Sequence, residues 1–307
     1  MRARSHAIGL LIALLSTGPS QASSSPPAAA SCPSFADGVE AGKLESRRIN
    51  EASGIAASHR NPGVYYVIND SGDSAKVYAI DQTGRDLGSF FVSGAQAIDW
   101  EDIAVGPAHD AAGFFLYVAD TGDNLERRDF VTVYRIPEPE ISPSTGVNVA
   151  AVQDVTSFRI RFPGGKSRDA EALFIDPNNA DLYIVTKTNK QASVYRYAAP
   201  HREDEIVTLQ KVAQLQIGLP PLFGSNKITA GDMSLVRNQI LLRTYSRVLL
   251  WSRSPGQSVA DALKKPPCTM PDRVEPQGES ITWTLDGTGY LTVSERLHQP
   301  LYLFRRK

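Results

Sequence analysis

Glu101-Asp102-Ile103-Ala104 is one copy of a short pattern that occurs five times along the chain. The other copies have the same length and a similar apolar second half: Ser53-Gly54-Ile55-Ala56, Glu171-Ala172-Leu173-Phe174, Gly231-Asp232-Met233-Ser234 and Glu279-Ser280-Ile281-Thr282. Two further apolar runs follow each copy within a few tens of residues. Self-similarity at a period of roughly 40 to 70 residues, built from short strands and turns, predicts a β-propeller.

The repeated runs are rich in Val, Ile, Tyr and Phe and are bounded by Gly, Asp, Asn and Pro, which is typical of strands. A fourth, outer strand fits at 86–92, 155–162 and 207–217, and a shorter one before Val274. None follows the last run, whereas the segment 42–49 has the length to close the last blade. We therefore predict an all-β propeller of five blades, with six as an alternative, whose ring is closed by an N-terminal strand that protects the sheet edge.

The N-terminus reads as a signal for export. Basic residues at positions 2 and 4 precede an apolar stretch at 7–15 that is too short to span a bilayer. We predict a signal peptide at 1–22, a disordered leader at 23–40, rich in Ser, Pro and Ala, and a single propeller domain at 41–307. This predicts a secreted or periplasmic protein, with a lipoprotein anchored through Cys32 as the alternative.

The composition excludes some partners and favours a disulfide. A net charge of −1 gives no support for binding to nucleic acid or to an anionic membrane surface, and we expect a monomer. The chain has two cysteines, Cys32 and Cys268. Cysteines in exported proteins usually pair, which predicts a bridge between them near the closure of the ring, the alternative being two separate thiols.

Polar residues converge on one mouth of the predicted channel. In an antiparallel blade, the start of the first strand and the end of the second lie at the same face. The first set is Glu51, Asp99, Glu101, Asp102, Asp169, Glu171, Asp232, Gln277 and Glu279. The second set is Asn69, Asp70, Asp73, Asp120, Asp123, Asn124, Lys187, Arg243 and Glu295. The sequence thus predicts a mainly anionic mouth.

Carboxylates that lie close together repel one another unless a positive charge offsets them. One source is internal pairing with nearby basic residues: Lys187, Arg243, Arg168, Arg273 and Arg296. The other is a bound cation, and oxygen ligands from several blades suit Ca²⁺, which takes six to eight of them. Scarce histidine and paired cysteines argue against zinc or copper. The loops 69–73 and 120–124 share the order Asp, small hydroxyl, Gly, Asp, so Asp70, Asp120 and Asp123 are further candidate ligands, with plain turns as the alternative.

Catalytic groups are harder to assign. His298 lies in a loop at the predicted mouth and is the one candidate general base there, the alternative being a solvated side chain. The chain has no Gly-x-Ser-x-Gly elbow and no P-loop, which gives no support for a serine nucleophile or a phosphate cradle.

The acidic openings Trp100-Glu101-Asp102, Asp169-Ala170-Glu171 and Gln277-Gly278-Glu279 resemble those of secreted calcium-dependent propeller hydrolases, a group that includes esterase-like phytases, gluconolactonases and paraoxonases. The resemblance implies calcium in the channel, Glu101, Glu171, Asp232 and Glu279 as ligands, and an ester, lactone or phosphoester substrate. The chain departs from that group in blade count and in having carboxylates where several members have Asn. A metal-assisted hydrolase and a non-enzymatic extracytoplasmic propeller that binds a ligand or protein at the mouth are thus the two functional hypotheses.

Overall fold

A computed structural model of the chain describes residues 32–188, 191–218 and 225–307. The chain divides into two units, Met1–Cys32 and Pro33–Lys307, and the architecture below is that of the second. The predicted signal peptide at 1–22 lies outside the described residues. Within these residues no helix is both long and apolar enough to cross a membrane.

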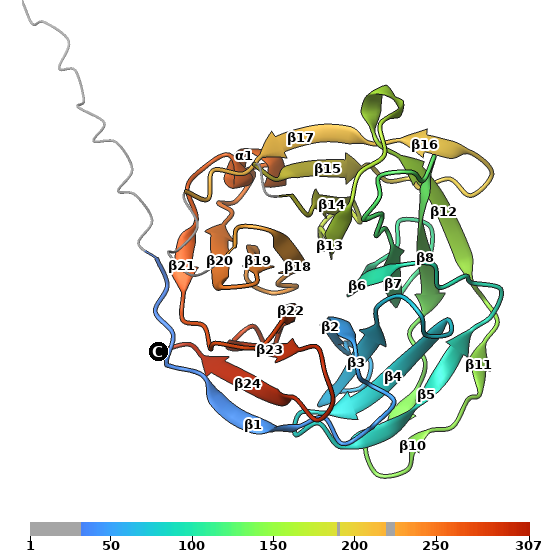
Figure 1. Cartoon of the computed structure of the whole chain (residues 1–307), viewed down its shortest axis with the longest axis vertical. Coiled ribbons are helices and arrows are strands. Elements are labelled where there is room, and N and C mark those ends of the chain that lie inside the picture. Colours follow the sequence, from blue (N-terminus) through green and yellow to red (C-terminus); the bar gives the residue numbers. More distant parts are fainter. Residues whose placement is uncertain (1–31, 189–190, 219–224) are drawn as a thin grey trace, which may run out of the picture. The chain divides into compact units, whose positions relative to one another are not determined.

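Five sheets surround a central axis (Figure 1), which confirms the prediction of five blades. From the axis outward, blade 1 consists of β2 (Ala52–Ala57), β3 (Val64–Asn69), β4 (Lys76–Asp81) and β5 (Asp86–Val92). Blade 2 consists of β6 (Trp100–Pro107), β7 (Phe114–Asp120), β8 (Val131–Pro137) and β12 (Thr156–Arg161). Blade 3 consists of β13 (Ala170–Ile175), β14 (Leu182–Thr186), β15 (Ser193–Tyr197) and β17 (Gln210–Gln214). Blade 4 consists of β18 (Ile228–Met233), β19 (Gln239–Thr244), β20 (Arg247–Ser252) and β21 (Cys268–Met270).

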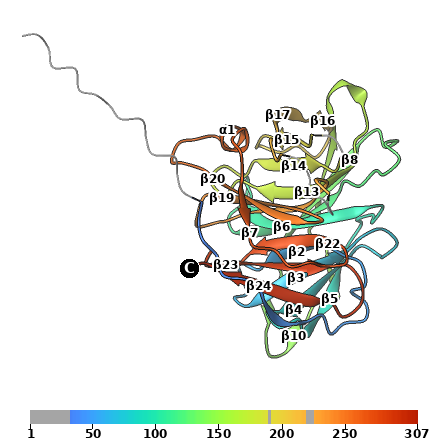
Figure 2. The same ribbon diagram turned by 60° about the vertical axis from the view of Figure 1, so that its left-hand side comes forward.

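Blade 5 joins the two ends of the unit. It consists of β22 (Gly278–Trp283), β23 (Gly289–Ser294), β24 (Pro300–Arg305) and, outermost, β1 (Val39–Lys43) from the N-terminal side. The N-terminal closure is confirmed, but the strand ends at Lys43 instead of running over 42–49. Leu44 and Ile49 are fully buried in an apolar cluster instead of continuing the outer edge. In the side view, β2 and β22 lie next to each other where the ring closes (Figure 2).

The N-terminal segment packs ahead of β1. Phe35 forms a β-bridge with Arg306, and its ring lies 5.1 Å from that of Tyr290 in an edge-on contact. The packed chain thus extends upstream of residue 41. Cys32 and Cys268, the only two cysteines of the sequence, are both disulfide-bonded, in agreement with the predicted pairing.

Short strands cover the outer edges of two blades. β11 (Ala151–Val152) adds to β5 in parallel, and β16 (Ile206–Thr208) adds to β12 in parallel. The remaining elements are a small hairpin of β9 (Ile141–Ser142) and β10 (Gly146–Val147), the 3₁₀ turn Pro163–Gly165, and α1 (Val259–Leu263). Strands of two or three residues are too short for a repeat pattern to show in the sequence, yet they occupy backbone groups that an open edge would present to other chains.

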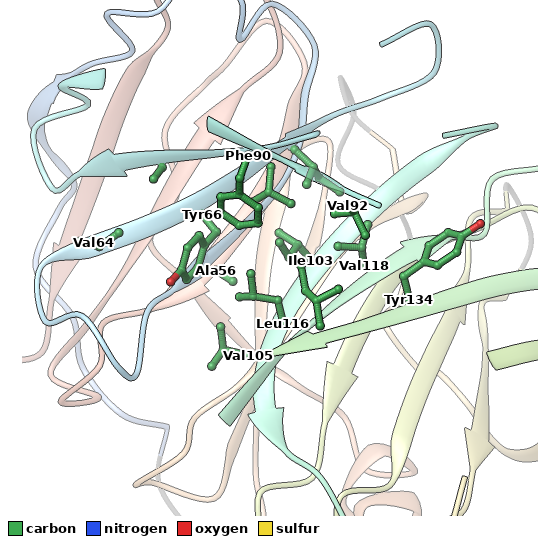
Figure 3. Packing of buried hydrophobic residues seen from close by; sticks show 14 of the residues in the cluster. Ala56, Val64, Tyr66, Phe90, Val92, Ile103, Val105, Leu116, Val118 and Tyr134 are labelled. Carbon is green, nitrogen blue, oxygen red and sulfur yellow. The ribbon is translucent and has the colours of Figure 1, made fainter. Parts of the chain in front are cut away.

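Apolar side chains fill the spaces between blades. Between blades 1 and 2, Tyr66 and Phe90 face Ile103, Leu116 and Val118 (Figure 3), and all five are buried. Successive side chains of a strand point to opposite faces of the sheet, so alternate residues of each strand face the same neighbouring blade. The packing fixes the inner strands in the order β2, β6, β13, β18, β22, with β22 next to β2 again.

Candidate functional site

A β-bulge opens each of the five inner strands. In each strand the register with its neighbour shifts across one residue, and these residues are Ser53, Glu101, Glu171, Thr229 and Glu279. A bulge re-aims the side chain at the extra residue and is common beside functional sites. The equivalent residue of blade 4 is therefore Thr229, and the Gly231-Asp232 copy in the sequence is displaced by two residues along its strand.

Seven carboxylates gather at one end of the inner strands, and we call them the acidic mouth: Glu51, Asp70, Asp99, Glu101, Asp169, Glu171 and Glu295. They form three overlapping groups, and within each group one ligand atom per residue lies within 4.8 Å of the others. The groups are Glu51–Asp70–Glu295, Asp70–Asp99–Glu101 and Glu101–Asp169–Glu171. Blades 1, 2, 3 and 5 contribute side chains, so the predicted convergence from several blades is observed.

Glu101 lies at the centre of the acidic mouth and belongs to two of the three groups. Glu101 is 3% exposed, and none of the described residues donates a hydrogen bond to its carboxylate. A Cβ atom at Gly122 would collide with Glu101 Oε1 and with the Asp99 carboxylate. The glycine of the 120–124 loop is thus needed where the backbone approaches these oxygens closely.

Several carboxyl groups of the acidic mouth have raised pKa values. Burial, together with the charges of Asp70 and Asp169, raises the pKa of Asp99 to about 6. Burial raises the pKa of Glu171 to about 9 despite the opposing effect of Lys187. For Glu101, burial and the neighbouring charge of Glu171 move the pKa well above its usual range. Without a cation, the charged forms of these groups are therefore disfavoured.

Glu279 borders the acidic mouth. Tyr245 donates a hydrogen bond to Glu279 Oε1 at 2.7 Å. The pKa of Glu295 rises to about 10 through burial and through its contact with Glu279. Glu279 thus belongs to the same charged region, although it lies outside the three groups above.

Basic side chains offset little of this charge. Lys187 is ion-paired with Glu171, and it is the one basic side chain among the described residues to form an ion pair with the acidic mouth. Arg243 is fully buried and binds Glu275 at 2.6 Å. The other three arginines considered as partners are also engaged or exposed elsewhere: Arg168 lies 4.0 Å from Glu126, Arg273 donates to the Gly38 carbonyl, and Arg296 is exposed.

Asp120 and Asp123, two of the predicted ligands, lie outside the three acidic groups. Asp120 forms an ion pair with Arg128 at 2.9 Å and accepts a hydrogen bond from the backbone N–H of Asp99. Asp123 accepts hydrogen bonds from the backbone N–H groups of Arg127 and Arg128. Both carboxylates hold the 120–128 loop in place, which is the plain-turn role considered for them.

Asp102 and Asp232 lie deeper in the channel and have hydrogen-bond donors. Asp102 accepts from the backbone N–H groups of Ile103, Leu173 and Gly231 at 2.9 to 3.0 Å, and thereby connects blade 2 to blades 3 and 4. Asp232 accepts from the backbone N–H groups of Met233 and Trp283 at 2.7 Å. Asp232, a predicted ligand, thus connects blade 4 to blade 5 and belongs to none of the acidic groups.

His298 is exposed, and its Nδ1 atom lies 3.0 Å from the Leu44 carbonyl oxygen. It also lies outside the acidic groups. Sequence reasoning did not single out Tyr245, whose hydroxyl reaches Glu279, because it lies two residues beyond Arg243 in the turn after β19. Tyr245 follows the second strand of blade 4, as Lys187 follows the second strand of blade 3, so the same antiparallel geometry places both at the mouth.

No protein-family model matches the chain, and no curated protein sequence matches it. Among solved structures, it is similar to the PQQ-bound form of aldose sugar dehydrogenase from Streptomyces coelicolor, with 12% identity, a TM-score of 0.48, and coverage of 92% of this chain and 100% of the other. It is also similar to the RRP9 WD40 repeats, with 11% identity, a TM-score of 0.43, and coverage of 83% and 80%. These likenesses concern the fold alone.

Proposed function

We propose that the acidic mouth binds a divalent cation, and that Ca²⁺ is the ion. The observation that carries the proposal is Glu101, a carboxylate that is almost fully buried at the meeting point of two acidic groups and receives no hydrogen bond from the described residues. An ionised carboxylate in such a place is costly unless a cation or donors compensate it. A cation among Asp70, Asp99 and Glu101 would supply that compensation.

The donor set suits calcium. All candidate ligand atoms are carboxylate oxygens, which hard cations prefer, and their number and origin in different blades match an ion with six to eight flexible ligands. Lys187 already occupies the side of Glu171, so the group Asp70–Asp99–Glu101 is the best location. Backbone carbonyls and water would complete the coordination.

Export of the protein fits this proposal. Disulfides persist in oxidising compartments outside the cytoplasm, and both cysteines here are bonded. We therefore place the protein in the periplasm or outside the cell, where the ligand of the acidic mouth would be a small molecule or another extracellular partner.

Isothermal titration with CaCl₂ of protein freed from metal with EDTA tests the ion site. We expect saturable binding to the wild type and at least a tenfold weaker affinity for Glu101→Gln. Glu40→Gln is the matched control, since Glu40 is exposed on the outer strand β1, and it should bind as the wild type does. Equal calcium affinity in Glu101→Gln and the wild type would refute the proposed location.

Hydrolysis assisted by the metal is the second candidate function, following the resemblance of the inner-strand motifs to propeller hydrolases. A bound Ca²⁺ would polarise a carbonyl or phosphoryl oxygen and lower the pKa of a bound water. Lys187 and Tyr245 supply further polar groups here, with the Lys187 Nζ atom 5.5 Å from the Tyr245 ring centre. They could orient an anionic or ester group of a substrate beside the ion.

A panel of chromogenic esters, lactones and phosphoesters, assayed with Ca²⁺ and with EDTA, separates the two functions. Turnover that depends on calcium and is lost in Glu101→Gln supports the hydrolase. Calcium binding without turnover of any member supports the alternative, a non-enzymatic propeller whose ion holds the blades and a ligand.

A further inference from the structure

A cavity of about 550 Å³ lies at the seam between blades 5 and 1. Its lining includes the turns after β2 and β22. These turns are at the opposite ends of the strands from the acidic mouth, so the cavity is separate from the proposed cation site. Its volume is in the usual range for small-molecule sites.

The fold keeps this cavity open by holding its walls together through the backbone. On one side, the N–H of Glu45, just after β1, donates a hydrogen bond to the Gly84 carbonyl in the β4–β5 turn at 3.0 Å. Gly42 and Gly84 have no room for a Cβ atom, because the backbone of the facing segment occupies that space. The two backbone segments that contribute Ala41 and Thr83 to the lining are therefore held against each other at this side of the cavity.

The walls are largely apolar. Tyr65, Leu291 and Leu303 line the cavity, and Leu291 and Tyr65 are buried members of the apolar cluster beneath it. Among the described residues, none is hydrogen-bonded to the Tyr65 hydroxyl. The cavity thus offers an apolar surface together with one free hydroxyl group.

Arg305 is the cationic residue of the lining, and no described carboxylate forms an ion pair with it. Asp286, the acidic lining residue, is already engaged in its own turn, where its carboxylate accepts hydrogen bonds from the hydroxyls of Thr284 and Thr288 at 2.6 and 2.8 Å. Asp286 keeps its charge, but its oxygens are occupied as acceptors, so the Arg305 guanidinium is the charged group of the lining whose donors remain for a ligand, and it is suited to a carboxylate or similar oxyanion.

We propose that this seam cavity binds a small amphipathic organic anion, with its aromatic or aliphatic body against Tyr65, Leu291 and Leu303 and its anionic group at Arg305. The inference is independent of the cation site. The ligand would bridge β24 and β1 of blade 5 to blade 1, and would therefore stabilise the ring at its closure.

Two fluorescent probes test the proposal: 8-anilinonaphthalene-1-sulfonate, an aromatic anion, and N-phenyl-1-naphthylamine, which is uncharged. We expect the anion to bind the folded wild type saturably at one site and to raise its Tm. Arg305→Gln should weaken the anion about tenfold and leave the uncharged probe unchanged. Arg85→Gln is the matched control, since Arg85 pairs with Asp81 in the β4–β5 turn and does not itself line the cavity.

Ala41→Trp places an indole in the cavity and should weaken both probes, with the melting curve showing whether the variant is folded. If Ala41→Trp unfolds, the Arg305→Gln and Arg85→Gln pair still decides the outcome. Absence of saturable anion binding to the wild type, or equal affinity in Arg305→Gln and Arg85→Gln, would overturn the proposal.

Discussion

Glu101 and Asp102 are neighbours in the chain, and both are buried at the axis of the ring, yet their surroundings differ completely. Asp102 accepts three backbone hydrogen bonds from three inner strands, whereas Glu101 accepts none from the described residues and faces other carboxylates. A buried charge with donors holds a structure together, and a buried charge without donors calls for a ligand. The middle of the channel is thus a joint between blades, and its mouth is a candidate binding site.

The largest expected effect is at the joint. Asp102→Ala removes the acceptor of three buried N–H groups, each of which costs about 1–3 kcal/mol when left unsatisfied. We expect the free energy of unfolding to fall by about 3 kcal/mol or more in urea denaturation. Asp154→Ala, at an exposed position, should change it little, and equal midpoints for the two variants would show that Asp102 holds nothing together.

Removal of calcium should have the next largest effect, and it concerns the mouth. A ligand that binds only the native state at 100 times its Kd stabilises that state by about 2.7 kcal/mol. EDTA should therefore lower the Tm of the wild type, and added CaCl₂ should restore it while equimolar MgCl₂ should restore less. A Tm that is indifferent to both EDTA and calcium would mean that no such ion is bound.

Asp232→Asn should separate joint from mouth more finely. The substitution replaces one of the two oxygens that hold Met233, Thr282 and Trp283, and we expect a loss of about 1–2 kcal/mol in stability. Calcium affinity should be unchanged, because Asp232 lies outside the acidic groups. A large loss of calcium affinity would instead return Asp232 to the ligand set predicted from the sequence.

The pH dependence of stability also concerns the acidic mouth. In the folded, metal-free protein the pKa values of Asp99 and Glu171 are about 6 and about 9, above their ordinary values of 3.8 and 4.5. The folded state therefore binds more protons, and stability falls as the pH rises through these windows. In EDTA, the Tm should decrease between pH 5 and pH 8, and saturating calcium should flatten this slope. A Tm that rises over this range in EDTA would contradict the raised pKa values.

Much of the fold could be predicted from the sequence because each blade repeats the same short apolar strands. The fourth strand β5 occupies the predicted range 86–92, and the N-terminal closure follows from the missing last strand. The site was harder, because a bulge shifts the register by one residue and no local pattern marks it. The fourth copy of the motif begins at Gly231 in the sequence, although the bulged residue of that strand is Thr229.

The loop residues show a second limit of sequence reasoning. Asp70 and Asp120 come from similar loops, but Asp70 joins the acidic mouth and Asp120 binds Arg128. The difference depends on Arg128, eight residues after Asp120. The folded loop, and not the local sequence, decides that its side chain reaches Asp120. Packing likewise decides which basic residues reach the carboxylates of the mouth. Lys187 pairs with Glu171, whereas Arg243 forms its ion pair with Glu275.

The melting temperature of Glu101→Gln, compared with that of the wild type in EDTA and in calcium, tests the account most directly. In EDTA, folding forces the Glu101 carboxyl group either to carry an uncompensated charge or to take up a proton, so the variant should melt higher than the wild type. Calcium should raise the Tm of the wild type more than that of the variant. A variant that melts below the wild type in EDTA and gains as much from calcium would contradict a cation site built around Glu101.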